Sequence, residues 1–397
     1  MEHIYATASL WLGLAVISAI IAYHLKISIA LIEICVGVIA GALAGVYFPP
    51  GALDNNAEWL KFLASSGAIF LTFLAGAELD KKTLALKWKE VLFVGLIGFL
   101  APFLGCSAAA HYLLNWPYQQ SLLAGVALST TSMAVVYAVM VETGFNRTEF
   151  GKGILGACFI NDLGTVIALG MIFSPFTHKT VVFILVSIVT LGMFPYITNH
   201  LTATYGNRTA AIRVKWISFT LFALGTLALW SGSEAVLPAY IAGMVLAEFA
   251  SNNTQWIRRM RTLTVGFLTP FYFLRAGTLV SMPALISAPL ALLVLFSGKV
   301  ATKIFGLYPA ITLFRKEKNE RWYYTLMMST GLTFGTISAM YGYSHGIIDE
   351  TQYSLLVIAV IASAVIPTMI AGLWFVPKHL LPEKHRVTEL KEELVEE

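Results

Sequence analysis

Residues 153–170 read GILGACFINDLGTVIALG. This stretch is long enough to cross most of the hydrocarbon core of a bilayer, and Asp162, which follows Asn161, is its only charged residue. A carboxylate at membrane depth is costly unless it faces a bundle interior or a water-filled cavity, and such residues commonly mark ion or proton pathways. The sequence therefore predicts an ion site at Asp162.

The composition of the whole chain places this stretch in a membrane protein. Of its 397 residues, 57% are hydrophobic and 12% are charged, whereas soluble domains carry about 25% charged residues. The apolar runs are continuous rather than alternating, which favours helices over a β-barrel. We predict an all-α polytopic protein with about 13 spans, at roughly 5–23, 27–47, 61–79, 90–113, 119–141, 151–173, 181–201, 214–231, 235–250, 263–282, 288–312, 322–345 and 352–376.

The lysines and arginines give this span count an independent test. When the connections alternate between the two sides of the membrane, one side receives 21 of the 26 basic residues and the other receives only Lys61 and Lys179. The positive-inside rule then puts the N-terminus outside and the C-terminus in the cytoplasm. The remaining three basic residues, Arg275, Lys299 and Lys303, fall inside spans.

The connections between these spans are too short to hold a second domain. We predict one transmembrane domain over residues 1–377 and a short charged cytoplasmic tail over residues 378–397. The three cysteines, Cys35, Cys106 and Cys158, lie in apolar runs without metal or redox spacing, so we interpret them as small buried apolar side chains.

Two lysines are predicted at nearly the depth of Asp162. At a rise of 1.5 Å per residue, Asp162 lies about 17 Å into its span, close to the midplane. Lys299 reaches almost the same depth from the outer side, and Lys303 follows one turn nearer the cytoplasm on the same helix face. A lysine paired with the acid could be displaced when a cation or proton arrives.

Hydroxyl residues interrupt two spans at this level. Residues 129–132 read STTS, and residues 329–336 read STGLTFGT. Such runs weaken a regular helix and supply oxygens that can satisfy freed backbone groups or coordinate a cation. The two spans run in opposite directions, which is typical of inverted repeats whose discontinuous helices cross at the midplane. We therefore predict a polar centre that Asp162 and Lys299 both face.

Simpler interpretations of these features stay open. Asp162 and Lys299 also fit a purely structural salt bridge, and the hydroxyl runs also fit close helix packing. Arg275, in FYFLRAG at 271–277, either pairs with an acid or lines a funnel. Glu33 lies about two turns from the cytoplasmic end of its span, where a structural or funnel role fits better than a binding role.

Several segments resemble motifs of one known family, and together they cover essentially the whole chain. They are GAIFLTFLAGAELD at 67–80, the span with Glu33 and spaced glycines at 26–45, AYIAG at 239–243, PFYF at 270–273, Gly298-Lys299 and Asn161-Asp162. The protein resembles the monovalent cation/proton antiporter superfamily, and most closely its second branch of bacterial sodium/proton exchangers.

This resemblance implies a homodimer in the bacterial plasma membrane that takes part in pH homeostasis. Dimerisation helices are expected at about 5–47 and 181–250. A mobile core, at about 61–173 and 263–376, would carry the ion in an elevator-type alternating-access cycle. The family requires no cofactor and no nucleic acid partner; its substrates are monovalent cations and protons.

The resemblance also assigns roles to residues. Asp162 would be the shared site of Na⁺ and H⁺, and Lys299 its basic partner. Asn161 stands where electrogenic members carry a second acid, so a single carboxylate predicts electroneutral 1:1 exchange, unless Lys299 also releases a proton. The remaining ligands and auxiliary candidates are Ser129, Thr130, Thr131, Ser132, Thr333, Lys303 and Arg275.

Other functions are weighed against this one. K⁺/H⁺ exchange or K⁺ efflux within the same superfamily is the nearest, although those systems usually add a cytoplasmic nucleotide-binding domain and often carry Gln-Asp at the acidic pair. From a different class, a channel or a membrane-embedded sensor would also use intramembrane polar residues. An enzyme is disfavoured, because the spans show no metal-ligand cluster and no nucleophile paired with a base.

Overall fold

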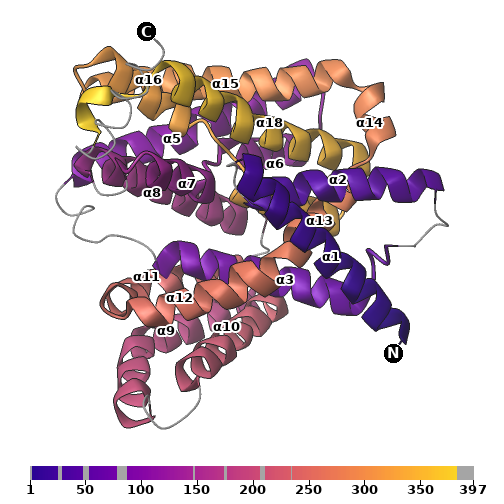
Figure 1. Ribbon diagram of the computed structural model, residues 1–397, viewed down its shortest axis with the longest axis vertical. Coiled ribbons are helices and arrows are strands. Elements are labelled where there is room, and N and C mark those ends of the chain that lie inside the picture. The colour runs from indigo at the N-terminus through magenta and orange to yellow at the C-terminus, as the bar shows by residue number, and fades with distance from the viewer. Residues whose placement is uncertain are drawn as a thin grey trace. The chain divides into compact units, whose positions relative to one another are not determined.

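The structure is a computed structural model that describes residues 2–25, 29–47, 53–77, 87–145, 148–173, 177–205, 211–233 and 235–381. Within these ranges every regular element is a helix, which confirms the all-α prediction (Figure 1). Nine helical segments among them are long and apolar enough to cross a membrane. The total of 13 crossings stays a prediction. Lys26, the Glu78 and Asp80 of the motif, and the tail beyond residue 381 lie outside the described residues.

The chain divides into two compact units. Unit 1 comprises residues 1–20, 33–81 and 166–278, and unit 2 comprises residues 21–32, 82–165 and 279–397. Residues 61–81 and 263–278, which the sequence groups with the mobile core, have their contacts in unit 1; the functional division stays a prediction. Three helices have residues in both units: α1 (Glu2–Leu25), α2 (Ile29–Tyr47) and α8 (Glu149–Phe173).

Unit 1 is built around a close contact between two helices. A Cβ on Gly76 of α3 would lie 2.3 Å from the Tyr240 carbonyl oxygen, and a Cβ on Gly243 of α11 would lie 2.1 Å from that of Phe73. Glycines therefore let the two backbones touch, as small residues do between membrane helices. The further elements of this unit are α3 (Glu58–Ala77), α9 (His178–Tyr205), α10 (Ile212–Trp230), α11 (Val236–Asn252), α12 (Thr254–Leu263), the π-helical turn η3 (Thr264–Leu268) and α13 (Thr269–Thr278).

Unit 2 contains two helices that are broken in the middle. The first consists of α6 (Tyr118–Ser129) and α7 (Met133–Glu142), and the second of α16 (Lys318–Met327) and α17 (Thr333–Ser344). Both predicted interruptions are confirmed. The other elements of this unit are α5 (Trp88–Ala108), the π-helical turn η1 (Ala109–Leu113), α14 (Met282–Ser287), α15 (Pro289–Thr312), α18 (Glu350–Trp374) and the 3₁₀ turn η4 (Lys378–Leu380).

The hydroxyl side chains explain why each helix stops where it does. Ser129 and Thr130 donate to carbonyls three residues back, those of Val126 and Ala127, at 2.8 and 3.1 Å. In the second break, Thr330 donates to the Met327 carbonyl at 2.8 Å. In each case the side-chain hydroxyl donates to a carbonyl that would accept from a backbone N–H if the helix continued. The hydroxyl thus competes with the helical hydrogen bond, and the helix ends there.

The two broken helices run in opposite directions past each other. A Cβ on Gly335 would lie 2.8 Å from the carbonyl oxygen of Ala127, and one on Gly342 would lie 1.9 Å from the side chain of Leu123. From Gly335 to Gly342 the contact shifts towards the C-terminus of α17, and on α6 it shifts towards the N-terminus, from Ala127 to Leu123. The two helices are therefore antiparallel. Where the breaks meet, the Ser132 amide donates to the Thr330 carbonyl at 3.2 Å.

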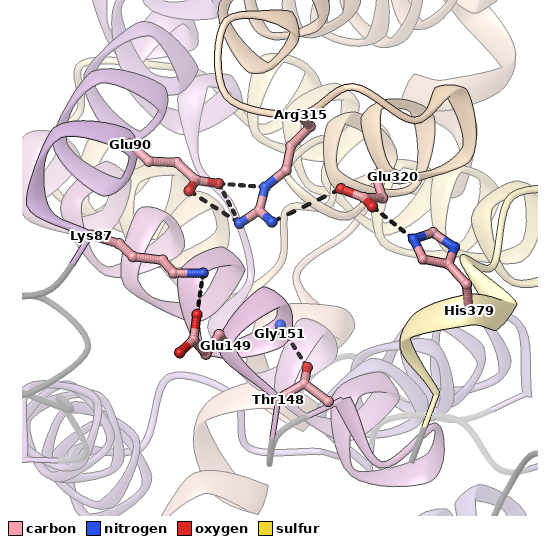
Figure 2. A network of polar contacts seen from close by, with 8 residues as sticks. All are labelled: Lys87, Glu90, Thr148, Glu149, Gly151, Arg315, Glu320 and His379. Carbon is pink, nitrogen blue, oxygen red and sulfur yellow. Dashed lines mark hydrogen bonds and ion pairs between the residues drawn. The ribbon is translucent and has the colours of Figure 1, made fainter. Parts of the chain in front are cut away.

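Charged side chains join the helix ends at one side of unit 2 (Figure 2). Arg315, which follows α15, donates two hydrogen bonds to the Glu90 carboxylate, from Nε at 2.9 Å and from Nη2 at 3.0 Å. Its Nη1 lies 3.9 Å from Glu320 of α16, which also contacts His379 of η4 at 2.8 Å. The guanidinium lies 5.1 Å above the ring of Phe150. One arginine thus connects the first turns of α5, α8 and α16.

Candidate functional site

Asp162 and Asn161 lie near the middle of α8 and are sealed from solvent. The exposed fractions of the two residues are 1% and 0%. The Oδ1 atom of Asp162 and both amide atoms of Asn161 have no hydrogen-bond partner. Buried polar atoms are nearly always satisfied, so unsatisfied ones need an explanation such as a bound ion or water, or a functional role. Three of them on adjacent side chains suggest a place for a polar ligand.

The first helix break brings backbone donors and oxygens to this acid. The Thr131 backbone N–H faces the Asp162 carboxylate. The Thr131 hydroxyl donates to the Met328 carbonyl of the second break at 2.9 Å. One threonine therefore links the carboxylate of α8 to both broken helices. Ser129, Thr130, Thr131 and Ser132 are all 0% exposed, and each hydroxyl oxygen keeps acceptor capacity after donating its proton.

Both buried lysines of α15 reach the crossing, where they contact different atoms. Lys299 Nζ donates to the Thr130 carbonyl at 3.3 Å, and Lys303 Nζ donates to the Thr131 hydroxyl at 3.1 Å. Each lysine has an exposed fraction of 0%. Thr130 follows the last residue of α6, where the helix dipole is negative, so an ammonium group there is favourable.

The simple salt bridge that the sequence left open does not form in this state. Among the described residues, neither lysine comes within the 4.0 Å that defines an ion pair with Asp162. The lysines instead bond to neutral oxygens of the first break. Within the same ranges no group of three or more His, Cys, Asp or Glu side chains is arranged to hold a metal ion.

Two glycines leave room for this arrangement. A Cβ on Gly331, in the second break, would lie 2.0 Å from Lys299 Nζ, so only glycine allows the ammonium to approach. A Cβ on Gly98 of α5 would lie 3.3 Å from the Asn161 amide nitrogen. Sequence reasoning noted the glycines of the second hydroxyl run as helix weakeners but missed this steric role, and it missed Gly98 and the Met328 carbonyl.

The remaining predicted residues lie at different places. Thr333 is the first residue of α17 and is buried, with an exposed fraction of 6%. Arg275 belongs to α13 in unit 1, where its Nε donates to the Asn55 carbonyl at 2.9 Å. Glu33 is a buried residue of α2 whose Oε2 has no hydrogen-bond partner.

The site therefore combines one buried acid with a set of neutral oxygens and two buried lysine amino groups that are hydrogen-bonded to the first break. The acid can hold either a proton or a small cation. Carbonyl oxygens can replace part of the hydration shell of a monovalent cation, and hydroxyl oxygens can accept in the same way. When they are protonated, these lysines bring positive charge that such an ion must compete with.

The comparisons with known proteins agree with this chemistry. A family model described as "Sodium/hydrogen exchanger, transmembrane" matches residues 12–376. The probable Na⁺/H⁺ antiporter 3 of Methanocaldococcus jannaschii is 25% identical over 345 residues, which cover 83% of this chain and 88% of that protein. The glutathione-regulated potassium-efflux protein KefC of Salmonella arizonae is 25% identical over 426 residues, which cover 99% of this chain but 64% of that protein.

A solved structure shares the fold. The sodium proton antiporter MjNhaP1 of Methanocaldococcus jannaschii superposes with a TM-score of 0.69 at 16% identity, covering 94% of this chain and 97% of the other. At this identity the match establishes the fold alone. Together with the apolar helices it shows that the chain is a multi-pass membrane protein.

Proposed function

The chain belongs to the transmembrane sodium/hydrogen exchanger family, and from that premise we propose that it exchanges Na⁺ or Li⁺ for H⁺ at Asp162. The family is one of transporters rather than enzymes, and it handles monovalent cations in a lipid bilayer. The curated relatives that are named as Na⁺/H⁺ antiporters support the choice of ions. The specific site, stoichiometry and cycle are our proposals.

One observation carries the proposal more than any other. Asp162 is buried, keeps an unbonded oxygen, and meets the crossing of two broken helices through the Thr131 N–H. A structural carboxylate would have its oxygens satisfied. An exchanger needs the opposite, because the free oxygen must accept a proton in one half-cycle and a cation in the other.

The proposed cycle is a competition for one carboxylate. When Asp162 releases its proton, it binds a partly dehydrated Na⁺ together with neighbouring hydroxyl and carbonyl oxygens. Thr131 and its neighbours are the proposed auxiliary ligands. The bare carboxylate is costly to move through an apolar environment, whereas the protonated and cation-bound states are not. Since proton and cation exclude each other, movement of the neutralised states couples the two fluxes.

One carboxylate supports electroneutral exchange of one proton for one monovalent cation. Asn161 adds an amide oxygen to the site but no second proton. This count requires that Lys299, which donates to the Thr130 carbonyl at the negative end of α6, keeps its proton throughout the cycle. Exchange would then be insensitive to membrane voltage.

The proposal extends from the site to the assembly. By resemblance to its superfamily, the chain would form a homodimer in a bacterial plasma membrane and move its ion by elevator-type alternating access. The basic-residue distribution supports an N-terminus outside and a C-terminus in the cytoplasm. Regulation of cytoplasmic pH would follow from such exchange.

K⁺/H⁺ exchange is the second candidate. The match to a potassium-efflux protein over 99% of this chain favours it, and the buried oxygens do not by themselves select an ion. A channel is the candidate from a different class. Flux through a channel would continue without an opposing proton gradient, which separates it from either exchanger.

The decisive experiment uses purified protein in liposomes that contain a trapped pH dye. With an acidic interior, addition of Na⁺ or Li⁺ should restore the dye signal within seconds, and K⁺ should do so weakly. D162N should abolish the response, because the amide can neither release a proton nor balance a cation. The matched control is D349N, since asparagine caps a helix as well as the aspartate that now caps α18.

Two outcomes would revise the function. A full response in D162N would exclude Asp162 as the shared site. A response that is larger for K⁺ than for Na⁺ would favour the second candidate. Repeating the assay with the voltage clamped by K⁺ and valinomycin tests stoichiometry: the Na⁺ response of an electroneutral exchanger should not change with voltage.

A further inference from the structure

Lys303 contacts the site in a way that the proposed exchange does not use. It lies one turn beyond Lys299 on the same face of α15, and its ammonium group is bonded to Thr131 at 3.1 Å rather than to the acid. Thr131 is also the residue whose backbone N–H faces the Asp162 carboxylate. Lys303 therefore contacts a direct neighbour of the carboxylate.

The hydrogen bonds of the Thr131 hydroxyl leave it a single orientation. The Lys303 amino group donates to the hydroxyl oxygen, which accepts. Its one proton then goes to the Met328 carbonyl, at 2.9 Å. Both lysine and threonine are 0% exposed, so water does not compete for these bonds. Without the ammonium group, the hydroxyl would be free to accept elsewhere and the link between the breaks would loosen.

The second effect of this chain of bonds is electrostatic. Met328 follows the last residue of α16, whose terminal carbonyls form the negative end of that half-helix. Lys303 acts on this end through the Thr131 hydroxyl, as Lys299 acts directly on the end of α6. The C-terminal ends of α6 and α16, two of the half-helix ends at the crossing, thus each have their own lysine.

Resting on the proposed exchange at Asp162, we propose that Lys303 is a positioning residue that holds Thr131 in place, and with it the Thr131 N–H on the carboxylate. It does not bind the transported ion. Its removal should therefore loosen the cation site through Thr131. Loss of the positive charge alone would change cation affinity in the opposite direction, because removing an ammonium group near a cation site favours cation binding.

These opposing effects are separated by a double-mutant cycle on the Na⁺ KM in proteoliposomes. K303M should raise KM in the parent protein. In a T131V background, K303M should no longer raise KM, because the hydroxyl through which it acts is gone. We expect the two KM ratios to differ about fivefold, which corresponds to roughly one hydrogen bond of coupling free energy.

Three further measurements decide the interpretation. K303R keeps a buried donor, so its KM should stay within about twofold of the parent. K61M removes the partly exposed Lys61 of α3 as a matched lysine control and should change nothing. If K303M changes KM by the same factor in both backgrounds, the positioning role is wrong. A loss of maximal rate with KM unchanged in every Lys303 variant would also overturn it, since it would indicate a folding role only.

The outcome stays distinct from a failure of the proposed function. If the parent protein shows no Na⁺-driven proton movement, or if D162N retains it, the exchange proposal fails. The double-mutant cycle on Lys303 and Thr131 then does not apply. If the parent exchanges ions and D162N does not, the KM ratios test Lys303 alone.

Discussion

Asn161 is as informative as the acid beside it. Both atoms of its amide are buried without hydrogen-bond partners, and each such atom costs about 1–3 kcal/mol of folding free energy. An apolar side chain would avoid that cost. The amide is therefore best explained by a ligand that occupies the site during the proposed cycle, because its oxygen can face a cation and its nitrogen can donate to a carboxylate or water.

Gly331 provides a test of how closely the lysine must approach. G331A would place a Cβ 2.0 Å from Lys299 Nζ, so the ammonium group must move away from the Thr130 carbonyl. We expect the rate of Na⁺-driven proton movement to fall at least tenfold, with only a small change in the thermal unfolding midpoint because a flexible side chain can yield.

The matched control is G372A in α18, where an added Cβ meets nothing within 4 Å. This variant should transport like the parent and be equally or slightly more stable, since alanine favours a helix. If G331A transports at the parent rate, contact between Lys299 and the end of α6 is not needed for exchange.

At the scale of helices, the sequence predicts where elements break but not how they face one another. The STTS and STGLTFGT runs placed both breaks correctly, because hydroxyl side chains compete with the backbone wherever they stand. The choice of acceptor for each lysine was missed. A lysine side chain is long and flexible, and the rotation of α15 about its axis depends on packing against α5 and α18, which no local pattern encodes.

The π-helical turn η3 shows a second limit of local patterns. It ends at Leu268, directly before Thr269-Pro270. Proline cannot donate a backbone hydrogen bond, so some adjustment of the preceding turn is expected. Whether that adjustment is a kink or a widened turn depends on the neighbours. In unit 1 the backbone of α3 comes so close here that a Cβ on Gly67 would lie 2.6 Å from the Leu268 carbonyl oxygen.

The ends of helices α5, α15 and α16 should depend on one arginine. R315A would leave the carboxylates of Glu90 and Glu320, with side chains only 10% and 11% exposed, without their guanidinium partner. Breaking a buried ion pair in this way costs about 3 kcal/mol. We expect the thermal unfolding midpoint of the purified protein to drop by several degrees.

Two variants calibrate that result. R315K keeps the charge but loses the two-pronged contact with Glu90, so its midpoint should fall between those of R315A and the parent. K316A removes the exposed neighbouring lysine and should leave the midpoint unchanged. A midpoint in R315A equal to that in K316A would show that the network in Figure 2 does not stabilise the fold.

At the scale of the molecule, the long-range charge pattern and the internal contacts carry different information. The basic residues predict which loops share a side of the membrane, since that distribution is selected during insertion. They say nothing about which helices pack together. The grouping of 61–81 with 166–278 in unit 1 arises from glycine-mediated backbone contacts such as Gly76 with Gly243, which are paired only once the chain has folded.

The orientation of the whole chain can be tested with single cysteines. In a background where Cys35, Cys106 and Cys158 are replaced by serine or alanine, K61C should react in intact cells with a membrane-impermeant maleimide, because its loop is predicted outside. K316C should react only after the membrane is opened. Both positions reach solvent in the structure, so accessibility within the protein does not limit the reaction.

If K316C were labelled in intact cells and K61C only after the membrane is opened, the topology would be inverted. The number of spans between the two positions would still be odd. Labelling of both sites in intact cells would instead change the parity of the spans between residues 61 and 316, and with it the depth assigned to Asp162. Nine crossings of the membrane are predicted between these two positions, so an odd number is required for them to lie on opposite sides. Because the antiparallel passage of the two broken helices is independent of that count, a parity error would revise the flanking helices and leave the site intact.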